Sequence, residues 1–108
     1  MPIIDELARY CHGQSRLEIA VAAYLEYLSD HPDSSIAHFN CAYYADKLGR
    51  HRLAIDHYLQ ALKFGIDRPE EAHLNIANIH ADALRDDAQA RRHLELALSI
   101  NATYAGAL

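Results

Sequence analysis

The segment HFNCA at residues 38–42 returns as HLNIA at residues 73–77, 35 positions further along the chain. A second pattern recurs three times, in which an alanine is followed four residues later by a large side chain. It occurs at Ala20 and Tyr24, at Ala54 and Tyr58, and at Ala90 and Leu94. Self-similarity at a period between 20 and 50 residues is typical of helical repeat proteins. The sequence therefore predicts a small array of repeated units.

Apolar residues recur every three or four positions through nearly the whole chain, which predicts helices. We expect helices near residues 3–12, 16–30, 35–48, 51–64, 69–84 and 87–99. The break between the first two helices is predicted from Gly13, which weakens a helix, and from Ser15 and Glu18, which have the spacing of a capping box. Gly49 suits the left-handed conformation that ends many helices. The chain thus reads as three helix pairs.

The paired helices resemble the tetratricopeptide repeat, a unit of roughly 34 residues in which small residues let two helices approach closely. The small residues that carry this resemblance are Ala8, Ala20, Ala42, Ala54, Ala77 and Ala90. The chain departs from the family pattern at Cys11, Ala45 and His80, where the family favours tyrosine, and at Tyr27, which replaces a small residue. The resemblance covers about residues 3–100.

What the resemblance implies is an all-α fold with three helix-turn-helix repeats stacked as a right-handed superhelical solenoid. The repeats would span about residues 2–34, 35–68 and 69–102 of a single domain, residues 1–108. Residues 103–108 would begin a further helix or form a tail.

The composition of the chain argues against some classes of partner. The formal net charge is −5, and no cluster of basic residues is present, which argues against a nucleic-acid partner. No apolar run approaches the roughly 20 residues of a membrane span, and the N-terminus does not read as a signal peptide. We therefore expect a cytoplasmic protein with no membrane partner. The two cysteines do not form a disulfide framework.

In the tetratricopeptide family the first helices of the units line a concave groove that holds a peptide. The residues expected to face such a groove are Arg9, Asn40, Tyr43, Lys47, Asn75, Asn78 and Asp82. Asparagine amides in a groove can donate to and accept from the backbone of a bound peptide. The alternative is that these asparagines only bridge neighbouring helices.

No catalytic, metal or cofactor site is expected. The eight histidines include no pair at the i, i+4 spacing of a helical metal site. His73 and His80 are seven residues apart, and His38 is the repeat equivalent of His73. Histidines at helix surfaces and between repeats explain this pattern better than zinc ligands do.

Two functions follow as hypotheses. The first is an interaction module that binds a peptide or protein segment in its concave groove. The second is an N-terminal accessory or oligomerisation domain of a larger bacterial enzyme such as a transferase. The last expected helix is apolar at Leu94, Leu96, Leu98 and Ile100. We expect this apolar end to be buried, either in the interface of a homo-oligomer such as a homodimer or under further repeats.

Overall fold

Five α-helices follow one another in the computed structural model, which describes the backbone of residues 2–100 and the side chains of residues 15–100. They are α1 (Pro2–Asp30), α2 (Ser35–Lys47), α3 (His51–Phe64), α4 (Pro69–Asp82) and α5 (Asp87–Ile100). Residues 2–100 contain no strand. The predicted all-α class is therefore confirmed.

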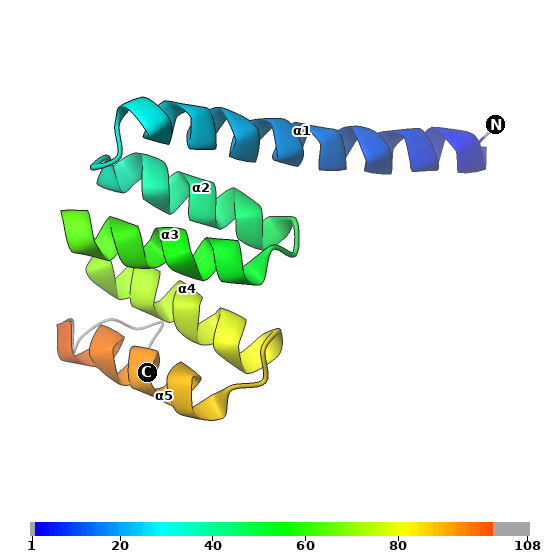
Figure 1. Ribbon diagram of the computed structural model, residues 1–108. Coiled ribbons are helices and arrows are strands. Elements are labelled where there is room, and N and C mark those ends of the chain that lie inside the picture. The colour runs from blue at the N-terminus through cyan, green and yellow to red at the C-terminus, as the bar shows by residue number, and fades with distance from the viewer. Residues whose placement is uncertain (1, 101–108) are drawn as a thin grey trace.

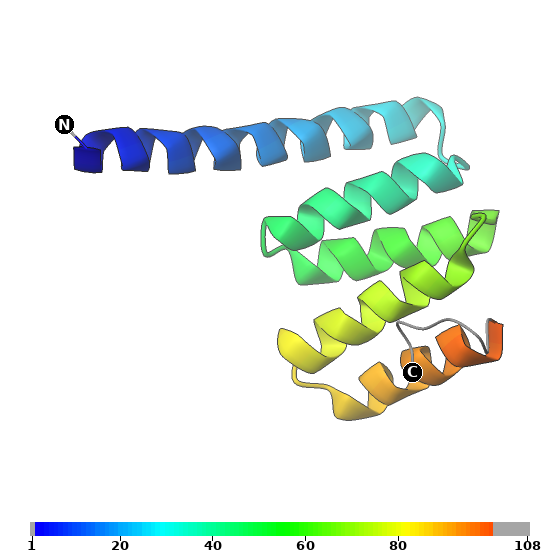
Figure 2. The same cartoon turned by 180° about the vertical axis from the view of Figure 1, so that it is seen from behind.

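The helices stack side by side in chain order, and each runs antiparallel to the one before it (Figures 1 and 2). The closest neighbours are α2 with α3 and α4 with α5, so the second and third predicted units each form a helix hairpin. The long helix α1 lies on α2 and continues well past it, since α1 has 29 residues and α2 has 13.

The predicted break at residues 12–15 is wrong. Residues 2–30 form one continuous helix, so the first unit has one long helix where two were expected. Residues 2–100 therefore contain five helices rather than six. Ser15 lies inside this helix and does not cap a new one. A single interior glycine costs a helix only about 1 kcal/mol, and no proline lies near Gly13 to remove a backbone hydrogen bond.

The turn between α2 and α3 forms as predicted. Gly49 has φ of +82°, and its N–H donates to the carbonyl of Asp46 at 2.9 Å. The N–H of Arg50 donates to the carbonyl of Ala45 at 2.9 Å, which closes the end of α2. In the connection between α4 and α5, Arg85 stands at the position equivalent to Gly49 and also has positive φ, at +54°.

The core consists of small side chains around one large one. Tyr58 is the largest fully buried side chain, and Cys41, Ala42 and Ala54 have no exposed surface. Burial raises the pKa of the Cys41 thiol. Small residues at these contacts allow the helix backbones to approach closely, as the sequence predicted. Within residues 2–100, no helix has both the length and the apolar character that crossing a membrane requires.

We predict opposite effects on stability at the two equivalent turn positions. Gly49→Ala is expected to lower the free energy of unfolding by about 1 kcal/mol, because a side chain disfavours positive φ. A Cβ atom at Gly49 would have no heavy atom within 4 Å, so the effect isolates the backbone conformation. Arg85→Gly should raise the free energy of unfolding, by less than about 1 kcal/mol because glycine also adds entropy to the unfolded chain. Urea denaturation measures both, and equal signs would contradict the equivalence of the two turns.

Candidate functional site

An open groove lies between the N-terminal halves of α2 and α4, which we call the α2–α4 groove. Its volume is about 380 Å³. It is lined by Ser35, Ile36, Phe39 and Asn40 of α2, by Gly65, Ile66, Asp67 and Arg68 of the α3–α4 connection, and by Glu71 of α4. The first turns of two equivalent helices therefore form its walls.

The α2–α4 groove combines an apolar wall with polar groups. Ile36 is 71% exposed although it is a large aliphatic residue. Phe39 is held by an edge-to-face contact with Tyr58, with ring centroids 5.3 Å apart. Arg68 pairs with Glu71 at 3.4 Å, whereas no ion pair joins Asp67 to another residue in the described part of the chain. The charge left uncompensated along this groove is therefore negative.

The predicted groove residues divide into separate groups. Asn40 lines the α2–α4 groove. Tyr43 and Lys47 are exposed further along α2, where the Lys47 Nζ atom lies 4.8 Å from the centre of the Tyr43 ring. Asn78 and Asp82 are exposed on α4 but do not line the groove. The side chain of Arg9 lies outside the described residues.

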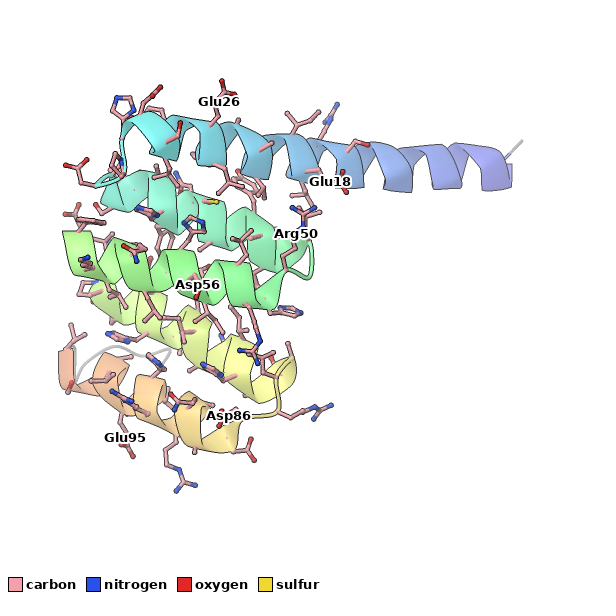
Figure 3. All side chains as sticks on the ribbon, in the orientation of Figure 1. Glu18, Glu26, Arg50, Asp56, Asp86 and Glu95 are labelled. Carbon is pink, nitrogen blue, oxygen red and sulfur yellow. The ribbon has the colours of Figure 1, made fainter. Side chains whose placement is uncertain are left out.

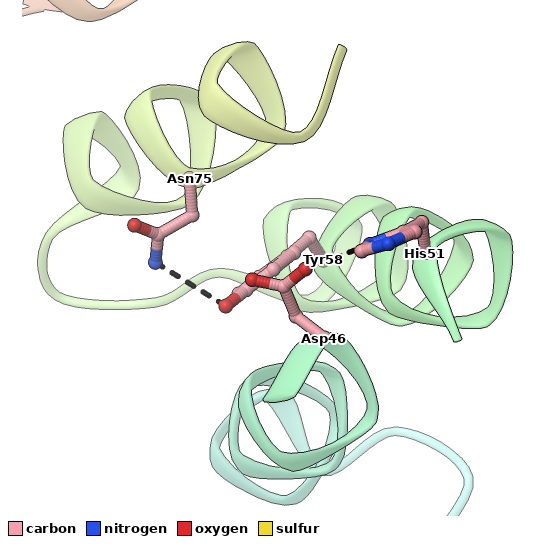
Figure 4. Close-up of polar contacts among 4 residues, drawn as sticks. All are labelled: Asp46, His51, Tyr58 and Asn75. Carbon is pink, nitrogen blue, oxygen red and sulfur yellow. Dashed lines mark hydrogen bonds and ion pairs between the residues drawn. The ribbon is translucent and has the colours of Figure 1, made fainter. Parts of the chain in front are cut away.

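Asn75 bridges two helices, which is the alternative that the sequence left open. Its Nδ2 donates to the hydroxyl oxygen of Tyr58 at 3.3 Å, from α4 to α3 (Figure 4). Burial first, and then the charge of Asp46, raise the pKa of Tyr58 to about 12, so this hydroxyl stays protonated. The same view shows His51 of α3 with its Nδ1 atom 3.1 Å from a carboxylate oxygen of Asp46 at the end of α2.

Sequence reasoning missed Ile36 and the residues between α3 and α4. Ile36 carries no polar group that would mark a binding residue, and Ile66 to Arg68 were assigned only to a connection. The only signal at Ile36 is a large aliphatic residue in the first turn of a helix, outside the repeated HFNCA segment. Its 71% exposure in the folded chain cannot be predicted from the local sequence.

A second groove lies between α1 and α2, and we call it the α1–α2 groove. Its volume is about 580 Å³. It is lined by Ala20, Ala23, Tyr24 and Tyr27 of α1 and by Ser34, Ile36 and Ala37 at the beginning of α2. Ile36 thus borders both grooves, and Tyr27 beside it is 47% exposed. Figure 3 shows Glu26 of α1 pointing away from α2.

Each hairpin is closed by a pair of histidines at equivalent positions. The Nδ1 atoms of His38 in α2 and His57 in α3 are 2.9 Å apart, and their ring centroids are 5.1 Å apart. The Nδ1 atoms of His73 in α4 and His93 in α5 are 3.0 Å apart, with centroids at 5.2 Å. Both ring pairs have an interplanar angle of 27°. The histidines therefore join the two helices of one unit and do not link successive units.

Each pair can hold only one proton between its two Nδ1 atoms. The Nε2 atom of His38 lies 2.8 Å from the carbonyl of Pro32, to which it donates. In the neutral pair its Nδ1 therefore accepts a hydrogen bond from His57. Burial, followed by the charge of His38, lowers the pKa of His57, and Asp56 opposes this shift. A second proton would place two N–H groups against each other.

The second pair has a third histidine beside it. Burial lowers the pKa of His73. Burial first, and then His73, His80 and Arg92, lower the pKa of His93 to about 4. The His80 ring stacks on His93 with centroids 6.0 Å apart, and its buried Nδ1 atom has no hydrogen-bond partner among the described residues. Even so, residues 15–100 contain no group of three histidine, cysteine or acidic side chains placed to hold a metal ion.

The sequence matches no protein-family model and no curated protein. The resemblance to the tetratricopeptide repeat thus rests on the internal repeat of this chain and stays a prediction.

We predict that the fold loses stability as the pH falls below about 6.5. The folded-state pKa values of His57, His73 and His93 lie below the unfolded value of 6.5. Their contribution to the free energy of unfolding is therefore complete above pH 6.5 and is lost as the pH falls toward the folded-state pKa values. His93→Gln should reduce the loss between pH 7 and pH 5 by about 1 kcal/mol, after allowance for partial exposure. Urea denaturation at the two pH values measures this loss. The exposed His31→Gln serves as control, and an unchanged slope in His93→Gln would contradict the assignment.

We also predict that Tyr58→Phe lowers the free energy of unfolding by about 1 kcal/mol, because the amide of Asn75 loses its partner while the ring still fills the core. Tyr58→Ala should cost more, about 3–5 kcal/mol, because it leaves a cavity under Phe39. Thermal or urea denaturation distinguishes the two, and a neutral Tyr58→Phe would show that the bridge contributes nothing.

Proposed function

We propose that this chain is a protein-protein interaction module that binds a peptide or protein segment in the α2–α4 groove. The observation that carries the proposal is the exposed Ile36 beside the amide of Asn40, at the mouth of an open groove on equivalent faces of α2 and α4. A hollow lined by apolar side chains with a few polar groups among them is the usual form of a binding site.

The arrangement of a tetratricopeptide array belongs to the same proposal. In it α2 and α4 are the first helices of two units, α3 and α5 are the second helices, and the units wind as a right-handed solenoid. The two equivalent histidine pairs and the equivalent turns at Gly49 and Arg85 support this arrangement. The first helices of such an array line the concave face, which is the face that the α2–α4 groove occupies in the proposal.

The groove favours a segment in which an apolar side chain lies close to a basic one. Ile36, Phe39 and Ile66 offer apolar contact, and the carboxylate of Asp67 offers an uncompensated negative charge nearby. The formal net charge of −5 attracts cationic partners over longer distances. Asn40 can hydrogen-bond the backbone of an extended peptide without demanding a particular side chain.

We predict that selection from a displayed random-peptide library enriches sequences with an aliphatic or aromatic residue close to Lys or Arg. Binding measured by fluorescence anisotropy on an enriched peptide should fall at least tenfold in Asn40→Ala/Asp67→Lys, which removes the amide and reverses the charge. That loss corresponds to about 1.4 kcal/mol or more.

The matched control is Asn78→Ala/Asp82→Lys, which makes the same changes at exposed positions of α4 outside the groove lining. It should bind as the unmodified chain does. Equal losses in the two variants would show that the loss follows from the change in net charge and not from the groove. Peptides whose binding neither variant changes would contradict the proposed groove.

A further inference from the structure

The α1–α2 groove lies where the other two units carry a first helix. In the repeat alignment, its α1 residues Ala20, Ala23, Tyr24 and Tyr27 correspond to Ala54, His57, Tyr58 and Ala61 of α3. In the second unit these positions are covered, since His57 and Tyr58 contact His38 and Phe39 of α2. In the first unit, residues 2–100 provide no covering helix, because α1 runs straight on.

The exposed side of α1 has the character of a helix-packing surface. Ala20 and Ala23 form a floor of small residues, with Tyr24 and Tyr27 beside it. Ile19, on the neighbouring part of the same side, is 67% exposed. The adjoining side of α1 is already used, since Val21 and Leu28 are buried in the common core. A groove with a floor of alanines admits a helix at close range, whereas an extended peptide would leave it partly empty.

The chain carries a helix segment that fits this position. Ile4, Leu7, Ala8 and Cys11 recur at helical spacing, and Leu7 and Ala8 are the repeat equivalents of the fully buried Cys41 and Ala42. Where the other units place histidines on both helices, the first unit has Ile4 and Ala23. The repeat position that holds a histidine pair in the other two units thus has two apolar residues in the first unit.

We propose that the α1–α2 groove of one copy binds residues 3–12 of a second copy of this chain. The continuous helix α1 carries this segment away from the groove of its own copy, past the end of the stack (Figures 1 and 2). Mutual exchange closes the assembly as a dimer, because each copy supplies one segment and accepts one. The proposal is independent of peptide binding in the α2–α4 groove, although the two grooves share Ile36 as a wall.

Sedimentation equilibrium on the full chain tests the proposal. The expected mass is twice 12.2 kDa. Ala23→Arg, which places a long charged side chain in the α1–α2 groove, should reduce the mass to that of a monomer while the circular dichroism spectrum stays helical. Ala22→Arg is the matched control and should remain a dimer. The equivalent positions of the other units are exposed and carry charged residues, Asp56 (labelled in Figure 3) and Arg92. A monomeric unmodified chain, or a dimeric Ala23→Arg, would overturn the proposal.

Two further experiments distinguish binding of the segment to a second copy from binding within the same chain. Leu7→Glu should also be monomeric, and a mixture of Leu7→Glu with Ala23→Arg should form heterodimers, because one intact segment meets one intact groove. In a Cys11→Ala background, Ile4→Cys/Ala23→Cys should oxidise to a disulfide-linked dimer. A mixture that stays monomeric, or a disulfide formed only within one chain, would show that the segment folds back onto its own groove and would overturn exchange.

Discussion

The close approach of two helix backbones inside each hairpin is the constraint on which the rest of this structure depends. Cys41, Ala42 and Ala45 of α2 have no exposed surface, and Ala54 of α3 is equally buried. Side chains this small leave no room for a shift in register without opening a void or creating a clash. The stacking of rings at His38 and His57, and the burial of Tyr58, both require the helix spacing that these residues permit.

The helices that lie inside a repeated hairpin could be predicted from the sequence. The HFNCA segment and its partner at 73–77 marked α2 and α4, and Gly49 marked a turn whose geometry follows from a strong local preference. The prediction failed at Gly13, where the preference is weak. The helix therefore continues through residues 12–15.

Some residues of the candidate site could likewise be placed from the sequence, and others could not. Asn40 and Tyr43 could be placed on one side of α2 from helical spacing alone. The bridging role of Asn75 could not, because it depends on the hydroxyl of Tyr58, which reaches Asn75 from another helix. Ile36 was missed for a related reason, since the two grooves that it lines are formed with residues of other elements. Pairwise contacts between units are therefore the information that a single sequence lacks.

Ile36 has a consequence for how the two grooves communicate. One side chain forms part of both walls, and at any moment it occupies a single rotamer. A molecule that holds Ile36 in one rotamer thereby fixes the shape that the neighbouring groove offers. Linkage would make such an effect reciprocal, so occupancy of either proposed site would change the affinity of the other by the same factor. The two proposed binding events would then be coupled at the beginning of α2 through a single aliphatic residue.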